Sequence, residues 1–513
     1  MSKRNYLLTF VTINAVLILA FVFLAYAPQA TMFSSSVLGS FLERSSSNEF
    51  SAVQAGDFRT LDPHAQAPND QIAIGLMYEP LIRFDSFLNL DPALAYTWYW
   101  QDDTHLVTKL RSDAVFHDFS AVTCADVSAS LLRAQTDEHS TLRDMFAHIT
   151  VSSDTERVCV FELAQPDYTF LRKLTRLYII PAHVIAASTN ADEPLMPIGT
   201  GRYQLSDIHK HKLIFTAFSD YYDYDAGLPE SVFLTAEPKK YNRLGILKKD
   251  AADVLLDTPA SFIRQIESRL DYVVKEVSSF ESMFLIYNID RDYLAQRAHR
   301  VQLSNIIQSI DIESVLADQS LYQLTQLAPS GVFGFSPDLH DISYAKSLSA
   351  PTADVFLTLG VTAANTTVAE ILQTKLVAHS IHLDIVVLPA DELQAAVQKG
   401  TLDMYLLGWR FDLGTVDELF TKLIHTKRDI FGELNGYGYD SREVDALIER
   451  ARAEINTDKR LKIWQGLMAR VVRDDIIGMP LLGIRRLYTT KPDTTLFQPR
   501  MDGLLIFNSH ELN

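Results

Sequence analysis

The chain has 513 residues, 47% of them hydrophobic, and carries 46 Lys and Arg against 64 Asp and Glu, for a formal net charge of −18. A single hydrophobic core stops growing at about 250–300 residues, so we expect at least two lobes. A chain this acidic lacks the clustered Lys and Arg that bind phosphates, which argues against nucleic acid as a partner. Repulsion between its negative charges favours a soluble monomer.

An uncharged, largely apolar segment covers residues 6–27, directly after two cations near the N-terminus. As a helix it would rise about 33 Å, enough to cross a hydrocarbon core of about 30 Å. We therefore expect residues 1–27 to form one transmembrane helix that anchors the chain, with the body outside the cytoplasm. Removal as a signal peptide after Ala27 is the alternative, although Pro28 disfavours cleavage there.

Residues 28–50 contain two runs of three serines and are expected to form a flexible linker. Beyond residue 50, strand and helix patterns alternate, which indicates an α/β body. In the first half, the periodicity predicts strands over 105–110 and 157–163 and helices over 125–134 and 167–174. Thr123 and Asp126 have the spacing of a capping box at the start of the first helix.

The second half shows clearer alternation of helix and strand. Apolar periodicity predicts strands over 354–359, 382–388 and 403–407, and helices over 303–317, 367–379, 391–400, 441–455 and 458–473. Ser441 is a suitable N-cap for the helix that follows it. This alternation indicates a lobe with a sheet at its centre.

Cys124 and Cys159 are the two cysteines of the chain. Outside the cytoplasm they could form a disulfide, which would close a loop of about 34 residues and contribute roughly 3–4 kcal/mol. Two buried free thiols are the alternative. Catalytic, phosphate-loop and zinc-ligand motifs are absent from the sequence, so we expect neither an enzyme nor a cofactor or metal site.

Several short sequence motifs, found in a fixed order, carry a family resemblance. They are LDPH at 61–64, YEPLIRF at 78–84, ALAYTWYW at 93–100, LRSDAVFHD at 110–118, PIGTGRYQL at 197–205, YDYDAGLPE at 222–230, GWRFDLGTVDELF at 408–420 and GYDSREVDALIERAR at 438–452. Together they resemble the extracellular solute-binding proteins of family 5, the peptide and nickel type that serves ABC transporters.

The resemblance implies an α/β, two-lobed periplasmic-binding-protein fold of type II, peptide-binding-like, preceded here by the N-terminal transmembrane helix. Lobe one would comprise residues 51–258 and 486–513, with 81–180 as an extra subdomain. Lobe two would comprise 259–485. The chain would cross between the lobes near 258 and 486, and closure about these crossings would capture a ligand.

The resemblance also implies where the ligand binds. In peptide-binding relatives, an aspartate three residues after the Gly-Trp pair accepts the ligand's α-ammonium, and Asp412 has that position. Trp409 would supply an apolar or cation–π wall beside it, and Arg410, between the two, is a further candidate ligand contact. Asp417 is expected to cap a helix over 418–425.

Three weaker candidates come from the other motifs. Arg202 stands where relatives usually have proline, and its guanidinium could bind a ligand carboxylate. His64 and Glu79 lie in motifs expected near the cleft. For each of the three, a structural or surface role is the alternative.

The function implied is capture of short peptides in an interlobe cleft and their delivery to ABC permease subunits in the inner membrane. The protein would work on the periplasmic side, as an anchored monomer or, after cleavage, as a secreted one. Alternatives are a tethered sensor or interaction protein on the same fold, and a receptor for a non-peptide solute.

Overall fold

The computed structural model describes residues 48–507, except 66, 189–194, 317–319, 340–350, 352, 493 and 495. The predicted anchor and nearly all of the predicted linker therefore lie outside the described residues. Strand β1 (Glu49–Gln54) begins before the predicted end of that linker at residue 50. Among the helices of the described part, none combines the length and the apolar character that a membrane crossing requires.

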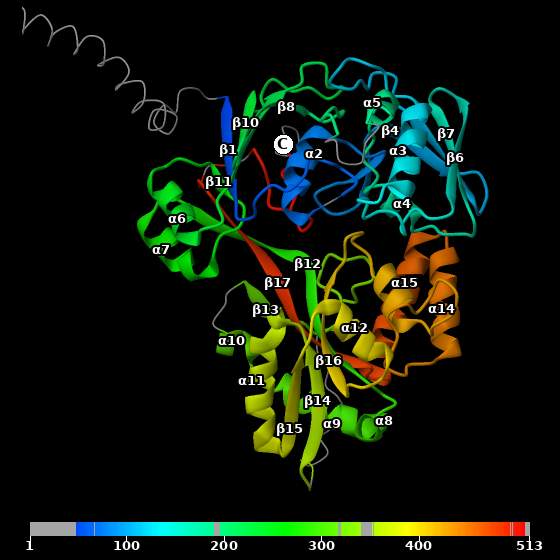
Figure 1. The fold of residues 1–513 in the computed structure, drawn as a ribbon, viewed down its shortest axis with the longest axis vertical. Helices are drawn as coiled ribbons and strands as arrows, with labels where there is room; N and C mark the ends of the chain where they lie inside the picture. Colours follow the sequence, from blue (N-terminus) through cyan, green and yellow to red (C-terminus); the bar gives the residue numbers. More distant parts are fainter. Residues whose placement is uncertain are drawn as a thin grey trace, which may run out of the picture.

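One long mixed sheet joins two lobes (Figure 1). Its strands follow the order β15-β14-β16-β12-β17-β11-β1-β10-β9-β8, and β13 also pairs with β17. Besides β1, they are β8 (Tyr203–His209), β9 (Lys212–Ala217), β10 (Ser231–Ala236), β11 (Val254–Leu255), β12 (Val273–Tyr287), β13 (Leu321–Gln323), β14 (Val355–Val361), β15 (Ile381–Val387), β16 (Met404–Arg410) and β17 (Gly478–Thr490).

Strands β12 and β17 run from one lobe into the other as an antiparallel pair (Figure 1). Their register shifts between Ser278 and Ser282. On the first-lobe side of that shift, Phe262 and Tyr272 pack with Val53 and Leu255. Residues 259–272, which the sequence assigned to the second lobe, thus pack on the first, because they fold back over β1 and β11 with helix α7 (Ile263–Arg269).

The first lobe carries a second, separate sheet with its own core. Strands β4 (Ala95–Trp100), β5 (His105–Leu110), β7 (Val158–Leu163) and β6 (Ile149–Thr155) form it, and helix α3 (Cys124–Thr136) packs on it. The predicted strands and the first predicted helix are confirmed here. The second, over 167–174, is a single turn, α4 (Phe170–Lys173).

A disulfide joins Cys124 at the start of α3 to Cys159 in β7, with 5.6 Å between their Cα atoms. Of the two alternatives for these cysteines, the structure shows the bonded one. At the same helix start, the Thr123 N–H donates to the Asp126 carboxylate at 2.8 Å, as the capping spacing predicts. The bond therefore ties the helix to the sheet it covers.

The second lobe has its sheet covered by helices (Figure 1). They are α9 (Arg297–Gln308), α10 (Ile312–Leu316), α11 (Thr366–Leu376), α12 (Ala390–Gln398), α14 (Arg442–Ala453) and α15 (Thr457–Ala469). The helix predicted over 303–317 is instead two helices, α9 and α10. The break occurs because Asp311 accepts the N–H of Ser314 at 3.0 Å and so starts a new helix. Ser441 caps α14, as predicted.

Candidate ligand-binding site

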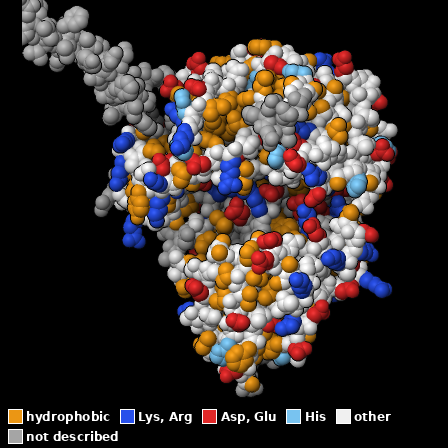
Figure 2. Space-filling model, viewed as in Figure 1, with side chains coloured by type: hydrophobic (Ala, Val, Ile, Leu, Met, Phe, Trp, Pro, Cys, Tyr) orange, Lys and Arg blue, Asp and Glu red, His pale blue; other side chains and the backbone are white. Residues whose placement is uncertain are grey.

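A cavity of about 440 Å³ opens between the lobes beside β12 and β17, and the surface is hollowed there with charged side chains of both signs around it (Figure 2). This volume is within the range of about 300–1,000 Å³ usual for small-ligand sites. The charged side chains lining it, together with that of Gln71, come from both lobes and from the crossing strands: Gln71, Arg243, Asp257, Glu281, Arg410, Arg485, Arg486 and Asp502.

Arg410 is the residue that links the two lobes at this cavity. Its Nε donates to the Asp412 carboxylate at 2.7 Å, one Nη donates to Glu281 at 3.3 Å, and the other donates to the Gln71 side chain at 3.1 Å. The antiparallel register of β12 and β16 places Glu281 opposite Arg410. Gln71 begins α2 (Gln71–Met77) of the first lobe. A single guanidinium therefore spans the cleft.

Asp412 lies at the cleft, as the sequence indicates, and lines a small cavity of about 40 Å³ that shares Gln71 and Asp502 with the larger one. Its carboxylate already has a cationic partner in Arg410. A ligand ammonium would have to compete with that guanidinium for the same carboxylate.

The other arginines of the cavity have different partners. Arg486 lies 3.6 Å from the Glu281 carboxylate, and its Nε is buried with no hydrogen-bond partner. Arg243, in α6 (Lys240–Lys248), is 7% exposed and donates to the carbonyl oxygens of Glu237 and Pro238 at 2.7 and 3.0 Å. Burial lowers the pKa of Arg243. Both arginines thus face the cavity with incomplete hydrogen bonding.

A second contact between the lobes joins α4 to α13 (Asp417–Leu419) and α14, and we call it the α4–α14 contact. The Asp167 carboxylate accepts from Lys173 at 2.7 Å and from Arg452 at 2.9 Å. Arg452 Nε lies 3.5 Å from Asp417. Burial raises the pKa of Asp417, whereas the neighbouring Lys173 and Arg452 outweigh burial and lower the pKa of Asp167. This contact is an ion cluster that holds the lobes together.

The predicted capping role of Asp417 is wrong. Val416 precedes the helix, Asp417 is its first residue, and the helix continues only as a π turn over Phe420–Ile424. The Asp417 side chain pairs with Arg452 instead. Trp409 packs at the edge of the second-lobe core, and its Nε1 is buried without a partner. Neither residue lines the interlobe cavity.

Glu79 and Arg202 line a different, smaller cavity of about 110 Å³ within the first lobe. Glu79 accepts hydrogen bonds from the hydroxyls of Tyr221 and Tyr222, both at 2.7 Å, and burial raises its pKa. Arg202 pairs with Asp223 at 3.1 Å and lies over the Tyr221 ring. The structure therefore brings these two together in a cavity that Asp412 does not line, although it shares Tyr178 and Asp502 with the small cavity beside Asp412.

His64 is completely buried, and its Nε2 lies 3.0 Å from the carbonyl oxygen of Tyr178. Burial lowers its pKa to about 4, so the ring is neutral at pH 7. A ligand contact at this position stays a prediction.

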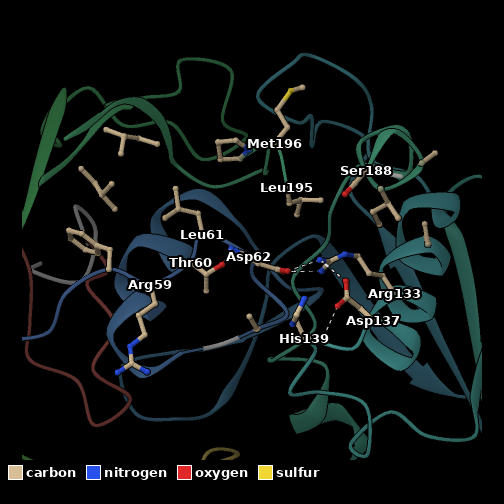
Figure 3. Close-up of a pocket in the computed structure, with 18 of the residues that line it drawn as sticks. Arg59, Thr60, Leu61, Asp62, Arg133, Asp137, His139, Ser188, Leu195 and Met196 are labelled. Atoms are coloured by element: carbon tan, nitrogen blue, oxygen red, sulfur yellow. Dashed lines mark hydrogen bonds and ion pairs between the residues drawn. The ribbon is translucent and has the colours of Figure 1, made fainter. Parts of the chain in front are cut away.

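The largest cavity described, of about 1440 Å³, lies in the first lobe (Figure 3). Its ion pairs are internal, because Arg133 binds Asp62 at 2.5 Å and Asp137 at 2.9 Å. All of its lining residues lie between 58 and 213, so movement of the lobes does not assemble it. Across the described ranges, His, Cys, Asp and Glu side chains form no group of three that could hold a metal ion.

Sequence reasoning missed Gln71, Arg243, Glu281 and Arg486 as residues of the interlobe cavity. They come from separate segments that only the sheet topology brings together. The one local signal was the adjacent pair Arg485-Arg486 in a strand-forming stretch.

Comparison with known proteins gives a consistent match. The model of bacterial extracellular solute-binding proteins, family 5 (middle region), matches residues 89–429. The nickel-binding periplasmic protein of Escherichia coli (strain K12) is 23% identical over 343 residues, 62% of this chain and 64% of that protein. The nickel-binding protein NikA of Staphylococcus aureus is 21% identical over 212 residues, 41% of this chain and 42% of its own length. These alignments therefore span less than two thirds of either relative.

Solved structures share the fold. HbpA2 from Haemophilus parasuis matches with a TM-score of 0.77 at 18% identity, over 90% of this chain and 100% of that one. The peptide-bound DppA from Helicobacter pylori matches with a TM-score of 0.67 at 18% identity, over 90% of this chain and 98% of that one. The two-lobed α/β architecture is thus the one these proteins have.

Proposed function

Because the chain belongs to the bacterial extracellular solute-binding proteins of family 5, we propose that it is the solute-capturing component of an ABC transporter and not an enzyme. The observation that carries the proposal is the cavity between the lobes, lined from both sides, with Arg410 of one lobe bonded to Gln71 of the other. A ligand in such a cavity stabilises the closed arrangement because it contacts both lobes.

The hinge belongs to the same proposal. Lobe one would comprise residues 51–258 and 486–513 together with residues 259–272, which pack on it. The crossing would bend at the register shift in β12, between Ser278 and Ser282, where the ladder is interrupted. The extra subdomain over 81–180 would move with lobe one.

The ligand class we propose is a short peptide or a small solute of similar size. The H. pylori DppA structure holds the peptide STSA, whereas two curated relatives are named for nickel. The closed protein would then dock on ABC permease subunits outside the cytoplasm, a location with which the Cys124–Cys159 disulfide agrees. Anchoring by residues 1–27 stays a prediction.

Native mass spectrometry of the full-length protein, purified from its source and then exposed to a peptide library and a metabolite extract, tests the proposal. We expect one bound solute per chain, with small-angle scattering that reports a more compact particle when the solute is present. Folded protein that captures nothing from any of the three sources would contradict the function.

A further inference from the structure

The carboxylates around the interlobe cavity are satisfied within the protein. Asp412 accepts from Arg410 at 2.7 Å, and Asp257 accepts the Ala55 N–H at 2.9 Å. Asp502 accepts from Arg500 at 2.7 Å and from the Leu504 N–H at 3.1 Å. Glu281 has both Arg410 and Arg486 beside it. Asp412, Asp502 and Glu281 therefore already have a cation from within the chain, whereas Asp257 is bonded to a backbone N–H.

The guanidinium groups are not satisfied to the same extent. Arg243 is more than nine-tenths buried, its hydrogen bonds go only to two carbonyl oxygens, and its Nε has no partner. It forms no ion pair with any carboxylate of the described residues. The two carbonyl oxygens compensate only part of the hydration that this buried guanidinium loses, so an anion beside it would lower its free energy.

Arg486 adds a second incomplete donor in the same cavity. Its Nε is buried without a partner, and its nearest carboxylate, Glu281, lies 3.6 Å away and is shared with Arg410. The backbone at Gly503 lies against this guanidinium, because a Cβ at that position would be 2.9 Å from Nη1. The segment around residue 503 therefore restricts the position of the Arg486 side chain. Planar guanidinium donors are best matched by the paired oxygens of an anion.

We propose that the interlobe cavity binds its solute by an anionic group, a carboxylate or a phosphate, through Arg243 and Arg486. Arg410 supplies, from within the chain, the cation that Asp412 would otherwise take from a ligand ammonium. This inference rests on the proposed function and names its substrate class. A peptide would be held by its C-terminal carboxylate, and its N-terminus would be free of Asp412.

Isothermal titration calorimetry of the full-length protein with two probes, succinate and inorganic phosphate, tests the proposal. Wild type should bind at least one of them saturably. Arg243→Gln and Arg486→Gln should each weaken that binding at least about tenfold. The matched control is Lys248→Gln, an exposed cation on the same helix as Arg243, which should bind like wild type. Tighter succinate binding identifies a carboxylate solute, and tighter phosphate binding a phosphorylated one.

Arg486→Lys keeps the charge but loses the planar donor pair, and should bind less well than wild type even if the Arg243 variant fails to fold. The proposal is overturned if folded wild type binds neither anion saturably, or if Arg486→Gln binds as wild type does. Native mass spectrometry separates this result from the proposed function. A captured cationic or neutral solute supports solute capture and overturns the anion site, whereas probe binding without any captured solute supports the anion site alone.

Discussion

The two contacts between the lobes use the same residue types in different surroundings. At the interlobe cavity, the side chains of Arg410, Asp412 and Glu281 are 22%, 38% and 34% exposed. At the α4–α14 contact, those of Arg452, Asp167 and Asp417 are 12%, 8% and 3% exposed. In the second contact each charged group lies beside one of opposite charge, and the side chains are almost inaccessible to solvent. The two contacts thus differ in how far packing excludes solvent from the same kinds of ion pair, and the solvent-accessible one is where we propose that a solute binds.

The largest effect should come from removing the Arg452 guanidinium of the α4–α14 contact. Arg452→Met leaves Asp167 bonded to Lys173 and leaves Asp417 buried without its ion-pair partner, with Arg460 as a further cation near both carboxylates. Because an uncompensated buried charge is costly, we expect a loss of about 3–5 kcal/mol in unfolding free energy, measured by urea denaturation. The control is Arg450→Met on the exposed face of the same helix, which should change stability by less than about 0.5 kcal/mol. Equal stability of both variants would mean that the contact does not hold the lobes.

A smaller effect should appear in the pH dependence of the same contact. The pKa of Asp167 is lower in the folded protein than in the unfolded chain, because of Lys173 and Arg452. Its stabilisation is therefore complete above about pH 4 and is lost as the pH falls further. We expect Asp167→Asn to cost about 2 kcal/mol near pH 6 and less than half of that near pH 2, by urea denaturation at each pH.

Asp417→Asn provides the matched comparison for that experiment. Burial raises the pKa of Asp417, so its ionised form is disfavoured by folding and acid relieves that cost. The asparagine variant should therefore lose less stability than Asp167→Asn near pH 6. Identical profiles for the two variants would show that the carboxylates are equivalent and contradict the assignment.

The smallest effect should come from removing a charge at the interlobe cavity. Asp412→Asn removes a carboxylate from the cleft and frees Arg410, so we expect the anionic probe to bind about threefold more tightly, by calorimetry, because a half-exposed charge acts through a high effective dielectric. Removing the exposed Asp458 of α15 by Asp458→Asn is the control for a mere change of net charge. A tenfold loss of peptide affinity in Asp412→Asn would instead support the ammonium anchor that the motif predicts.

Local patterns predicted the elements whose causes are local. The strands over 105–110 and 382–388 and the helices that begin at Thr123 and Ser441 depend on periodicity and capping within a few residues, and the structure has them close to the predicted bounds. The family resemblance predicted the two-lobed architecture and placed Asp412 at the cleft.

Long-range partners explain what sequence reasoning missed. Asp417 looked like a cap because nothing nearby in sequence reveals Arg452 or Thr169 as its neighbours. Nothing in the motif indicated that the Arg410 guanidinium would pair with the Asp412 carboxylate. The position of that guanidinium is fixed by Glu281 on the adjacent strand and by Gln71 on the other lobe. Such contacts depend on sheet register and lobe closure, which a motif does not encode.

The order of strands in the long sheet has a consequence for folding. Strand β17, at 478–490, lies between β11 and β12, so the chain must emerge almost to its end before that sheet can close. The four-stranded sheet, by contrast, is built entirely from residues 95–163 and contains its own disulfide. This part can therefore fold and form its disulfide before the chain is complete, whereas β11 and β12 each keep an unpaired edge until β17 is available, and unpaired strand edges favour aggregation.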